Sequence, residues 1–429
     1  MESGNATDIW PLRWNAGLDC SRSLLISRQI KIIIKSKENL SDMLRITPRK
    51  SLELASKIRT KMKKEWGRNM NVLILSSQFG MGHQMAAKAI GEEILKLDKD
   101  ANVIELDLLR YYYPKASRYI FRLFQMMVEH CYGIYNLVYK TTGKLKVDLK
   151  PMGINLYRKL EKLMEDHYPD MIVCTLPLCA KSIASYMEKT GKHIPLVTCI
   201  TDISIHPEWI TPQADAYLAP TKEVKENLVR NGASPEQIFV TGIPVRQQFL
   251  GEVPMRDKGQ KKILIMGGGL GIIPNLDRLM QVIHRMPGIT ATVITGKNRK
   301  AYEAFQGRYE DIEVLGYTEN ISKYMKEADL VITKAGGITL FELIHCQVPL
   351  FVIHPFLEQE VNNARYAQNM GIAKVIWNKS SDFPGILEKF LSDGRQWEQM
   401  AENISKAKDE IMEWSLDDAM NTVMERMAA

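Results

Sequence analysis

Residues 70–76 read Met-Asn-Val-Leu-Ile-Leu-Ser, and a glycine-containing turn, Ser-Gln-Phe-Gly-Met-Gly-His, follows at 77–83. A continuous run of branched apolar side chains is typical of a strand that is buried on both faces of a parallel sheet. The pattern then predicts a helix over 84–97. A strand, a glycine turn and a helix in this order form the first unit of a doubly wound sheet.

The same alternation continues along the chain. Apolar runs of strand type occur at 103–106, 171–174, 196–201, 216–219 and 239–241, and after a polar segment at 251–259 they recur at 263–266, 290–295, 313–315, 330–333, 350–353 and 373–376. The pattern predicts an α/β fold with two doubly wound domains, residues 70–250 and 260–405, facing each other across a cleft. For the helical segment 406–429, packing back on the first domain is one option.

The composition is that of an ordinary globular protein, with 429 residues, 45% hydrophobic and 25% charged. It excludes collagen-like sequence, general disorder and a multi-span membrane protein. The net charge of +7 is uneven, because residues 1–70 hold fifteen basic and seven acidic side chains and the rest is close to neutral. We therefore predict a basic N-terminal extension over 1–69, disordered or arising from a misassigned start upstream of Met70, and no nucleic-acid partner.

Cysteine usage and hydropathy indicate the compartment. The six cysteines form no Cys-x-x-Cys pair, and most lie in strand-like runs, which predicts reduced thiols in a cytosolic protein. No run reaches the eighteen or so uncharged apolar residues that span a bilayer, so we expect any membrane contact to be peripheral.

One segment combines basic and aromatic side chains. Residues 104–150 hold eight basic and four acidic residues and nine of the 34 aromatics, with Arg118 and Arg122 beside Tyr112 and Phe121. The combination is typical of an interfacial helix on an anionic membrane. A surface helix whose aromatic side chains belong to the core is the alternative.

Each predicted domain has one glycine turn directly after its first strand. The first places Gly82 and His83 at a helix N-terminus, which favours anions or a developing oxyanion; a purely structural turn is an equal alternative. The second, Met-Gly-Gly-Gly-Leu-Gly at 266–271, suits a diphosphate. It lacks the ending of a P-loop, and no acidic residue is placed as in a dinucleotide fingerprint, so an NTPase or a dehydrogenase is disfavoured.

The most specific stretch is Thr-Lys-Ala-Gly-Gly-Ile-Thr-Leu-Phe-Glu at 333–342, which follows a strand and opens a helix. Its helix N-terminus suits a phosphate, and Glu342, one turn later, suits ribose hydroxyls. Residues 355–363 cluster amides and carboxylates that suit sugar hydroxyls; the alternative is a solvated helix start.

These motifs, in this order, resemble the monogalactosyl- and glucosyl-diacylglycerol synthases, which are GT-B glycosyltransferases of family 28 related to the peptidoglycan N-acetylglucosaminyltransferase. The resemblance covers about residues 70–410 and implies two facing Rossmann-like domains. It rests on Gly-Met-Gly-His at 80–83 with Ala86 and Ala87, Thr201-Asp202 with His206 and Trp209, Thr-Gly-Ile-Pro-Val at 241–245, the glycines of 267–271, Thr-Gly-Lys-Asn at 295–298, Gly316-Tyr317 with Asn320, and residues 334–342.

The resemblance also implies roles for single residues. It makes His83 the candidate general base. Asp202 is the second candidate, and its alternative role is to cap the turn that follows. His206 and Trp209 either shape the acceptor mouth or pack their loop. The implied donor-binding residues are Gly268, Gly269, Ile338 and Thr339 around the diphosphate with Gly296, Lys297, Ala335, Gly336 and Gly337, Gly316 and Tyr317 near the uracil, Glu342 on the ribose, and Gln359 and Glu360 facing the sugar. The family usually has Pro-Gly-Gln-Glu where residues 357–360 read Leu-Glu-Gln-Glu, which leaves the donor sugar open.

The function that this implies is inverting transfer of a hexose from UDP-glucose or UDP-galactose to diacylglycerol, at the cytoplasmic face of the cell membrane. No cofactor and no essential metal are expected, since the Asp-x-Asp at 98–100 lies away from every glycine turn. The alternatives are a transferase of the same fold that acts on a polyprenyl-diphosphate lipid or a small natural product, a UDP-N-acetylglucosamine epimerase, and a non-catalytic sugar-nucleotide sensor. The basic and aromatic segment disfavours the epimerase, because a soluble substrate needs no interfacial surface.

Overall fold

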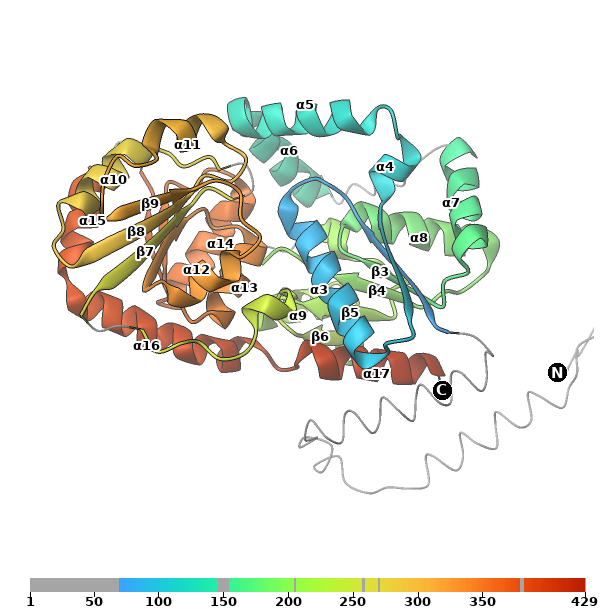
Figure 1. Ribbon diagram of the computed structural model, residues 1–429. Coiled ribbons are helices and arrows are strands. Elements are labelled where there is room, and N and C mark those ends of the chain that lie inside the picture. Colours follow the sequence, from blue (N-terminus) through green and yellow to red (C-terminus); the bar gives the residue numbers. More distant parts are fainter. Residues whose placement is uncertain are drawn as a thin grey trace, which may run out of the picture. The chain divides into compact units, whose positions relative to one another are not determined.

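The structure is a computed structural model, and it describes residues 69–145, 154–203, 206–256, 259–268, 271–378 and 382–428 (Figure 1). The predicted extension, up to residue 68, and Gly269 of the second glycine turn lie outside the described residues. Two six-stranded parallel sheets organise the described part. This confirms the predicted α/β fold with two doubly wound sheets.

The first sheet has the strand order β2-β1-β3-β4-β5-β6. Its strands are short and mostly buried, as expected for strands that are covered by helices on both faces. They are β1 (Asn71–Ser76), β2 (Asn102–Asp107), β3 (Met171–Cys174), β4 (Leu196–Cys199), β5 (Ala216–Ala219) and β6 (Ile238–Val240). The order reverses between β1 and β3, and open parallel sheets bind ligands at the carboxyl ends of the strands beside such a point.

The second sheet has the order β12-β11-β10-β7-β8-β9. Its strands are β7 (Lys261–Met266), β8 (Ile289–Ile294), β9 (Ile312–Leu315), β10 (Leu330–Thr333), β11 (Leu350–Ile353) and β12 (Ala373–Ile376). The order reverses between β7 and β10. The glycine turn after β7 and the helix start after β10 therefore flank the point where ligand binding is expected.

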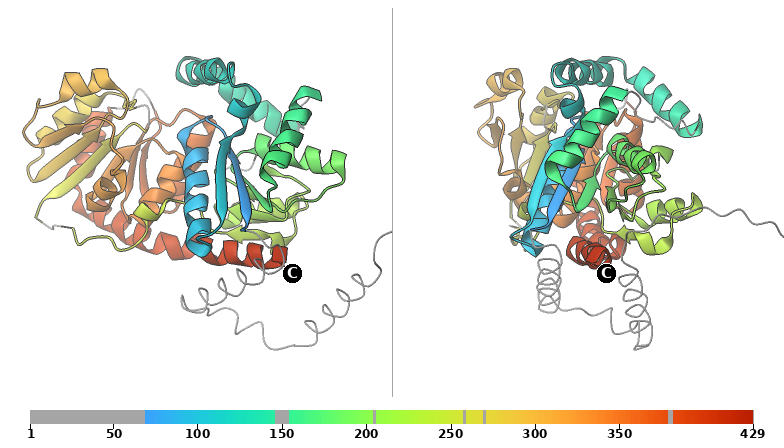
Figure 2. Two further views of the ribbon diagram at one scale, coloured as in Figure 1. Left: turned by 45° about the vertical axis from the view of Figure 1, so that its right-hand side comes forward. Right: turned by 90° about the vertical axis from the view of Figure 1, so that its right-hand side faces the viewer.

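Helices connect the strands and cover both faces of each sheet, as the views in Figure 2 show. We call the described residues up to 256 the first half and those from 259 the second half. In the first half the helices are α3 (Met81–Leu97), α4 (Leu108–Tyr112), α5 (Ser117–His130), α6 (Tyr132–Leu145), α7 (Ile154–His167), α8 (Pro177–Thr190) and α9 (Lys222–Arg230), with the 3-10 turns η1 (Pro207–Trp209), η2 (Pro235–Gln237) and η3 (Gln247–Phe249). In the second half they are α10 (Leu276–His284), α11 (Arg299–Phe305), α12 (Ile321–Glu327), α13 (Gly337–His345), α14 (Glu358–Asn369) and α15 (Phe383–Ser392), followed by α16 (Gly394–Ile411) and α17 (Leu416–Ala428).

One apolar cluster spans both sheets, beside others that belong to a single sheet. A single buried cluster includes Ile74 and Ile90 of the first half together with Phe341 and Leu343 of the second, and α3 packs against α13. Burying apolar surface of this kind stabilises the arrangement by about 25 cal/mol per Å². The halves are therefore joined through the helices that begin at their ligand-binding edges.

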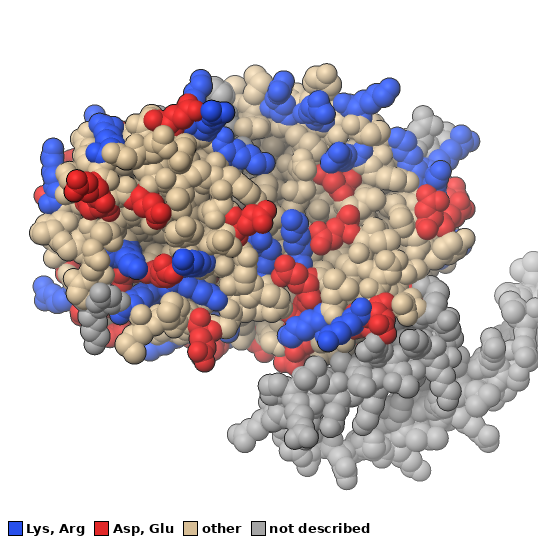
Figure 3. Space-filling model, in the orientation of Figure 1, with Lys and Arg blue, Asp and Glu red and all other residues tan. Residues whose placement is uncertain are grey.

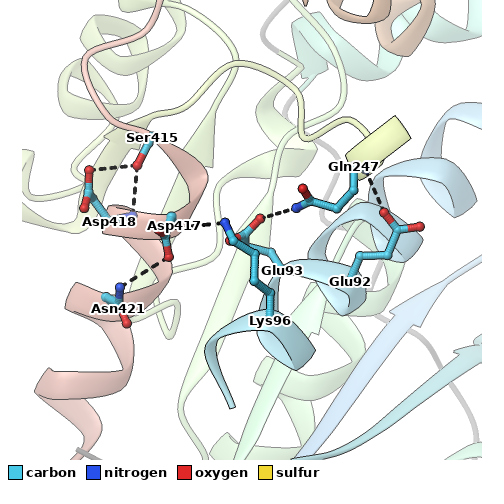
Figure 4. Close-up of polar contacts among 8 residues, drawn as sticks. All are labelled: Glu92, Glu93, Lys96, Gln247, Ser415, Asp417, Asp418 and Asn421. Atoms are coloured by element: carbon cyan, nitrogen blue, oxygen red, sulfur yellow. Dashed lines mark hydrogen bonds and ion pairs between the residues drawn. The ribbon is translucent and has the colours of Figure 1, made fainter. Parts of the chain in front are cut away.

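The last helix returns to the first sheet. Lys96 of α3 lies between Glu93 of its own helix (2.9 Å) and Asp417 of α17 (3.9 Å), as Figure 4 shows. The Trp414 ring packs edge-on against Phe239 of β6 at 5.1 Å between centroids. These contacts tie α17 to α3 and β6. The domain boundaries at residues 250, 260 and 405 stay a prediction.

A glycine at the junction of the halves gives a test of this packing. Gly242 has φ +74°, and a Cβ placed there would lie 2.8 Å from side-chain carbons of both Phe341 and Met412. Gly307 has a similar φ of +67° with nothing within 4 Å. Gly307→Ala should cost only the left-handed penalty, about 1 kcal/mol, whereas Gly242→Ala should cost a further 1–3 kcal/mol or so for overpacking.

Thermal unfolding of the two variants measures this difference. Gly242→Ala should lower the melting temperature clearly more than Gly307→Ala does. Equal melting temperatures would show that the junction is not closely packed at Gly242.

Candidate functional site

The N-terminus of α3 approaches the N-terminus of α13 from the other half. A Cβ on Gly82 would lie 3.7 Å from the Ile338 side chain, and a Cβ on Gly337 would lie only 2.7 Å from the Thr201 carbonyl oxygen. Glycine at 337 is therefore required for this approach. The result is that two helix N-termini, each with unpaired N–H groups in its first turn, lie at the same place.

His83 is held by the ends of two neighbouring strands. Its Nδ1 lies 2.8 Å from the Thr175 carbonyl oxygen after β3 and 2.8 Å from Thr201 Oγ1 after β4. Because a carbonyl oxygen only accepts, Nδ1 carries the proton and Nε2 keeps its lone pair. Burial lowers the pKa of His83 to about 4, although the hydrogen bond to Thr175 acts in the opposite direction. The imidazole is therefore neutral at neutral pH.

Asp202 lies beside this histidine, one residue after Thr201. Its carboxylate accepts hydrogen bonds from Gln359 Nε2 (2.8 Å) and from the side chain of buried Trp209. Burial raises the pKa of Asp202 to about 7, and the two hydrogen bonds oppose the increase. The Trp209 ring lies 6.5 Å from the His83 ring, so Trp209 supports both candidate bases.

His206 packs the loop that carries Asp202. Its buried ring places Nε2 3.2 Å from the Tyr139 carbonyl oxygen, while Nδ1 accepts from the Glu208 N–H at 3.4 Å. The ring also lies 4.8 Å from the Tyr139 ring. The main chain thus engages both nitrogens and His206 packs its loop, while a role at the acceptor mouth stays a prediction.

The glycine turn after β7 packs on the turn after β8. A Cβ on Gly271 would overlap the Thr295 carbonyl oxygen, so only glycine fits, and Asn298 Nδ2 donates to the Gly271 carbonyl oxygen at 3.3 Å. On the same turn Gly268 (φ +68°) is exposed. On the next turn Gly296 is half-buried and Lys297 is exposed. Gly316 and Tyr317 follow β9, and Tyr317 is 62% exposed.

The loop before α13 is held by a residue of α14. Buried Asn363 of α14 donates through Nδ2 to the Ala335 carbonyl oxygen at 2.9 Å, directly ahead of Gly336, Gly337, Ile338 and Thr339. Glu342 lies buried one turn along α13. Burial raises the pKa of Glu342 to about 8, and the Arg246 guanidinium of the first half acts against the increase.

Gln359 and Glu360 start α14, but the side chain of Gln359 is engaged within the protein. It donates to Asp202 and its Oε1 accepts from the Tyr135 hydroxyl at 3.2 Å. Burial raises the pKa of Glu360, and Lys334 opposes the increase. Sequence reasoning missed Tyr135 and Thr175, and it named Thr201 only within the motif with Asp202, without a role. For Thr175 the available signal was a polar residue directly after the predicted strand 171–174.

The basic and aromatic segment forms three helices rather than one. Tyr112 of α4 is only 3% exposed and packs in the core, so its predicted place on the membrane surface is wrong: the apolar ring is stabilised by burial against the first sheet. Phe121 is half-buried and packs edge-on against Phe79 at 5.4 Å. No helix in the described ranges is long and apolar enough to cross a membrane.

The outer face of α5 carries the remaining predicted residues. Arg118 and Arg122 are exposed, and Tyr119 (70%) and Leu123 (69%) lie next to them on the same face. Basic side chains gather over α5 along the upper edge of the view in Figure 3. This face therefore combines two guanidinium groups with large exposed apolar side chains.

A cavity of about 220 Å³ lies where α6 meets the carboxyl ends of β11 and β12. It is lined by Tyr132, Pro274, Asn275, Ile353, His354, Phe356, Ile376, Asn378 and Phe383. One lining residue, Tyr132, comes from the first half and the others from the second. The cavity thus adjoins the loop that leads into α14.

Both halves of the chain match known protein families. The sequence model of the family described as monogalactosyldiacylglycerol (MGDG) synthase matches residues 83–245, and that of the glycosyltransferase family 28 C-terminal domain matches residues 264–418. The processive diacylglycerol beta-glucosyltransferase of Bacillus pumilus (strain SAFR-032) is 31% identical over 361 residues, which cover 78% of this chain and 90% of that protein. The protein of the same name from Bacillus subtilis (strain 168) is 29% identical over 363 residues, covering 78% and 91%.

Solved structures agree on the fold. Acinetobacter baumannii MurG has a TM-score of 0.57 at 15% identity, covering 83% of this chain and 99% of that one. UDP-GlcNAc 2-epimerase from Neisseria meningitidis has a TM-score of 0.52 at 14% identity, covering 83% and 99%. At these identities the likeness concerns the two-domain GT-B arrangement alone.

The sequence matches carry more than the fold, because they extend over both halves and nearly the whole length of the relatives. The chain belongs to the family of the monogalactosyldiacylglycerol synthases and processive diacylglycerol beta-glucosyltransferases, with a glycosyltransferase family 28 C-terminal domain.

Proposed function

We propose that this protein transfers a hexose from a UDP-sugar to diacylglycerol, with inversion at the anomeric carbon. Family membership supports the reaction class and both substrates. The observation that carries the proposal is the junction of His83 and Asp202 from one half with Gln359 and the α13 N-terminus from the other. In a direct displacement one group must accept the proton of the attacking hydroxyl, and another must stabilise the negative charge of the leaving group. Here the two groups come from different halves.

In the proposed mechanism His83 is the general base. Its Nε2, kept unprotonated by the hydrogen bond of Nδ1 to Thr175, accepts the proton of the acceptor hydroxyl as that oxygen attacks the anomeric carbon. The bond from the anomeric carbon to the UDP oxygen breaks at the same time. The N-terminus of α13 and the turn containing Gly268 stabilise the charge that develops on the diphosphate.

The other donor-binding roles rest on position. Gly316 and Tyr317 suit the uracil because they follow β9 directly. Glu342, one turn into α13, suits the ribose, and Glu360, in the first turn of α14, suits the sugar, because both helices begin at the carboxyl edge of the second sheet. Gln359 also lies there, but contact with the sugar requires it to leave Asp202 or to share its amide between the two. These assignments are part of the proposal.

The exposed face of α5 suits a peripheral contact with an anionic membrane, where diacylglycerol resides. Guanidinium groups attract anionic headgroups, and exposed apolar and aromatic side chains insert at the interface. Location at the cytoplasmic face of the cell membrane is likewise part of the proposal. An acceptor other than diacylglycerol, such as a polyprenyl-diphosphate lipid or a small natural product, is the competing reading of the same site.

A transfer assay tests the function. The full chain is incubated with radiolabelled UDP-glucose or UDP-galactose and diacylglycerol in mixed micelles, and label is counted in the organic phase. Label is expected there with one of the two donors, and activity in EDTA should match activity in added Mg²⁺ if no metal is essential. No transfer from either donor, despite measurable UDP binding, would reject diacylglycerol as the acceptor.

His83→Ala tests the base. Transfer should decrease at least about a hundredfold, because general-base catalysis contributes roughly 10²–10⁴-fold. Binding of UDP should stay near the wild-type value, since the donor-binding residues lie in the second half. Titration calorimetry with UDP serves as the control. Unchanged transfer would assign the base to another group.

The pH profile separates His83 from Asp202. With His83 as base and a pKa of about 4, the unprotonated form predominates above that value, so kcat/KM should be flat from about pH 5 to about pH 8. With Asp202 as base and a pKa of about 7, kcat/KM would instead rise with pH through neutrality. The measured position of the acidic limb decides between them.

The double variant Arg118→Gln/Arg122→Gln tests the membrane face. Each basic residue near an anionic surface contributes about 1 kcal/mol, so binding to vesicles with anionic lipid should weaken by roughly tenfold or more. Lys181→Gln/Lys189→Gln on α8 removes the same charge elsewhere and serves as the control. Equal weakening by both pairs, or no change in either, would contradict a specific membrane contact through α5.

A further inference from the structure

Residues 356–359 comprise the end of the loop before α14 and the first two residues of that helix, and Asn136 of α6 makes two hydrogen bonds to their main chain. Asn136 Nδ2 donates to the Phe356 carbonyl oxygen at 2.8 Å, and Asn136 Oδ1 accepts from the Glu358 N–H at 3.0 Å. Both polar atoms of one carboxamide thus engage the main chain of the other half. Two hydrogen bonds to neighbouring main-chain groups fix the position and the orientation of the loop.

The hydrogen bond to Glu358 replaces a cap that the helix itself lacks. The residue before α14 is Leu357, whose apolar side chain makes no cap hydrogen bond. The Glu360 carboxylate accepts from the main chain of Phe356 and Leu357, which leaves the Glu358 N–H to a partner from outside the segment. Unpaired N–H groups in the first turn of a helix destabilise it unless side chains or water accept their hydrogen bonds. Asn136 supplies this acceptor from α6, and so the start of α14 depends on a residue from the first half.

Other contacts from the same face of α6 reinforce the arrangement. The Tyr132 ring lies 5.2 Å from the Phe356 ring, the Tyr135 hydroxyl donates to Gln359 Oε1, and Lys140 Nζ lies 3.0 Å from Glu358 Oε2. Spacings of three, four and eight residues place these side chains on one face of a helix. The other face of α6 presents Ile134 (59% exposed) and Leu137 (63% exposed).

The position of the loop determines where Gln359 and Glu360 lie. Both begin α14, and Gln359 reaches Asp202 from there at 2.8 Å. The uracil, ribose and diphosphate sites come from other segments, after β7, β8, β9 and β10. Displacement of the loop should therefore affect the groups near the sugar first, because the hydrogen bond of α14 to the loop before α13 joins Asn363 and the Ala335 carbonyl oxygen, more than one turn from the start of α14.

We propose that Asn136 is a positioning residue for the donor sugar: it orients residues 356–359 so that the start of α14 binds the hexose of the UDP-sugar. The inference rests on the proposed function and names a residue of the first half that acts on donor binding in the second. Its signature is selectivity, because Asn136 contributes to the affinity for UDP-hexose and not to the affinity for UDP.

Asn136→Ala in the full chain tests this, with UDP and the UDP-hexose that the wild type uses each titrated by calorimetry. The affinity for UDP-hexose should decrease about tenfold while that for UDP changes less than twofold, and the KM for the donor should increase in parallel. A misplacement of about 1 Å in such groups can cost roughly a hundredfold in rate. Asn136→Asp keeps the acceptor for the Glu358 N–H but loses the donor, so its effect should be intermediate.

Two variants serve as controls. Lys140→Met removes only a half-exposed ion pair, which contributes little on its own, and should change the affinity ratio less than threefold. Asn231→Ala removes an exposed asparagine whose hydrogen bonds lie within α9 and should change nothing. If Asn136→Ala weakens UDP and UDP-hexose equally, or neither, the inference is wrong. Absence of transfer by the wild type would instead reject the proposed function, while the affinity ratio would still report on Asn136.

Discussion

The close approach of α3 and α13 is the constraint on which the site depends. Gly337 lies against the Thr201 main chain, and Gly242 lies against Phe341 and Met412. A side chain at either position would push the halves apart. At the junction where these positions let the main chains meet, Asp202 of one half is hydrogen-bonded to Gln359 of the other. Small residues at the junction thus place a candidate base from one sheet beside the donor-binding edge of the other.

Burial then determines the charge of the site before any substrate arrives. The same desolvation lowers the pKa of His83 to about 4 and raises those of Asp202 and Glu342 to about 7 and about 8. At neutral pH the imidazole is uncharged and the carboxyls are partly protonated. A diphosphate that enters this site meets little negative charge, and helix N-termini can stabilise it without strong repulsion from neighbouring carboxylates.

Much of the fold was predictable, because buried parallel strands are short continuous apolar runs. Each of the twelve strands in the described part of the chain overlaps a run read from the sequence, including three-residue β6. Position after a predicted strand also singled out the turn with His83 and the segment 333–342 with Glu342, whereas their roles came from the resemblance and stay predictions. Tyr112 was misplaced because an aromatic residue among arginines has the same local pattern whether its ring faces lipid or the core. The contacts of Tyr135 and Asn136 with residues more than 200 positions away have no local signal at all.

Residue 358, where the sequence departs from the family pattern, takes part in these long-range contacts. Where the related enzymes usually have glycine, Glu358 directs its carboxylate to Lys140 of α6 and its N–H to Asn136. The additional side chain therefore points to the first half of the protein, and its ion pair lies at the same contact as the two hydrogen bonds of Asn136. An exposed ion pair contributes little energy by itself, whereas hydrogen bonds to main-chain groups at a helix start contribute about 1 kcal/mol each. The loss of glycine is thus accommodated by contacts with α6, and any change in sugar preference at this position would act through the placement of the loop rather than through direct contact of Glu358 with the sugar.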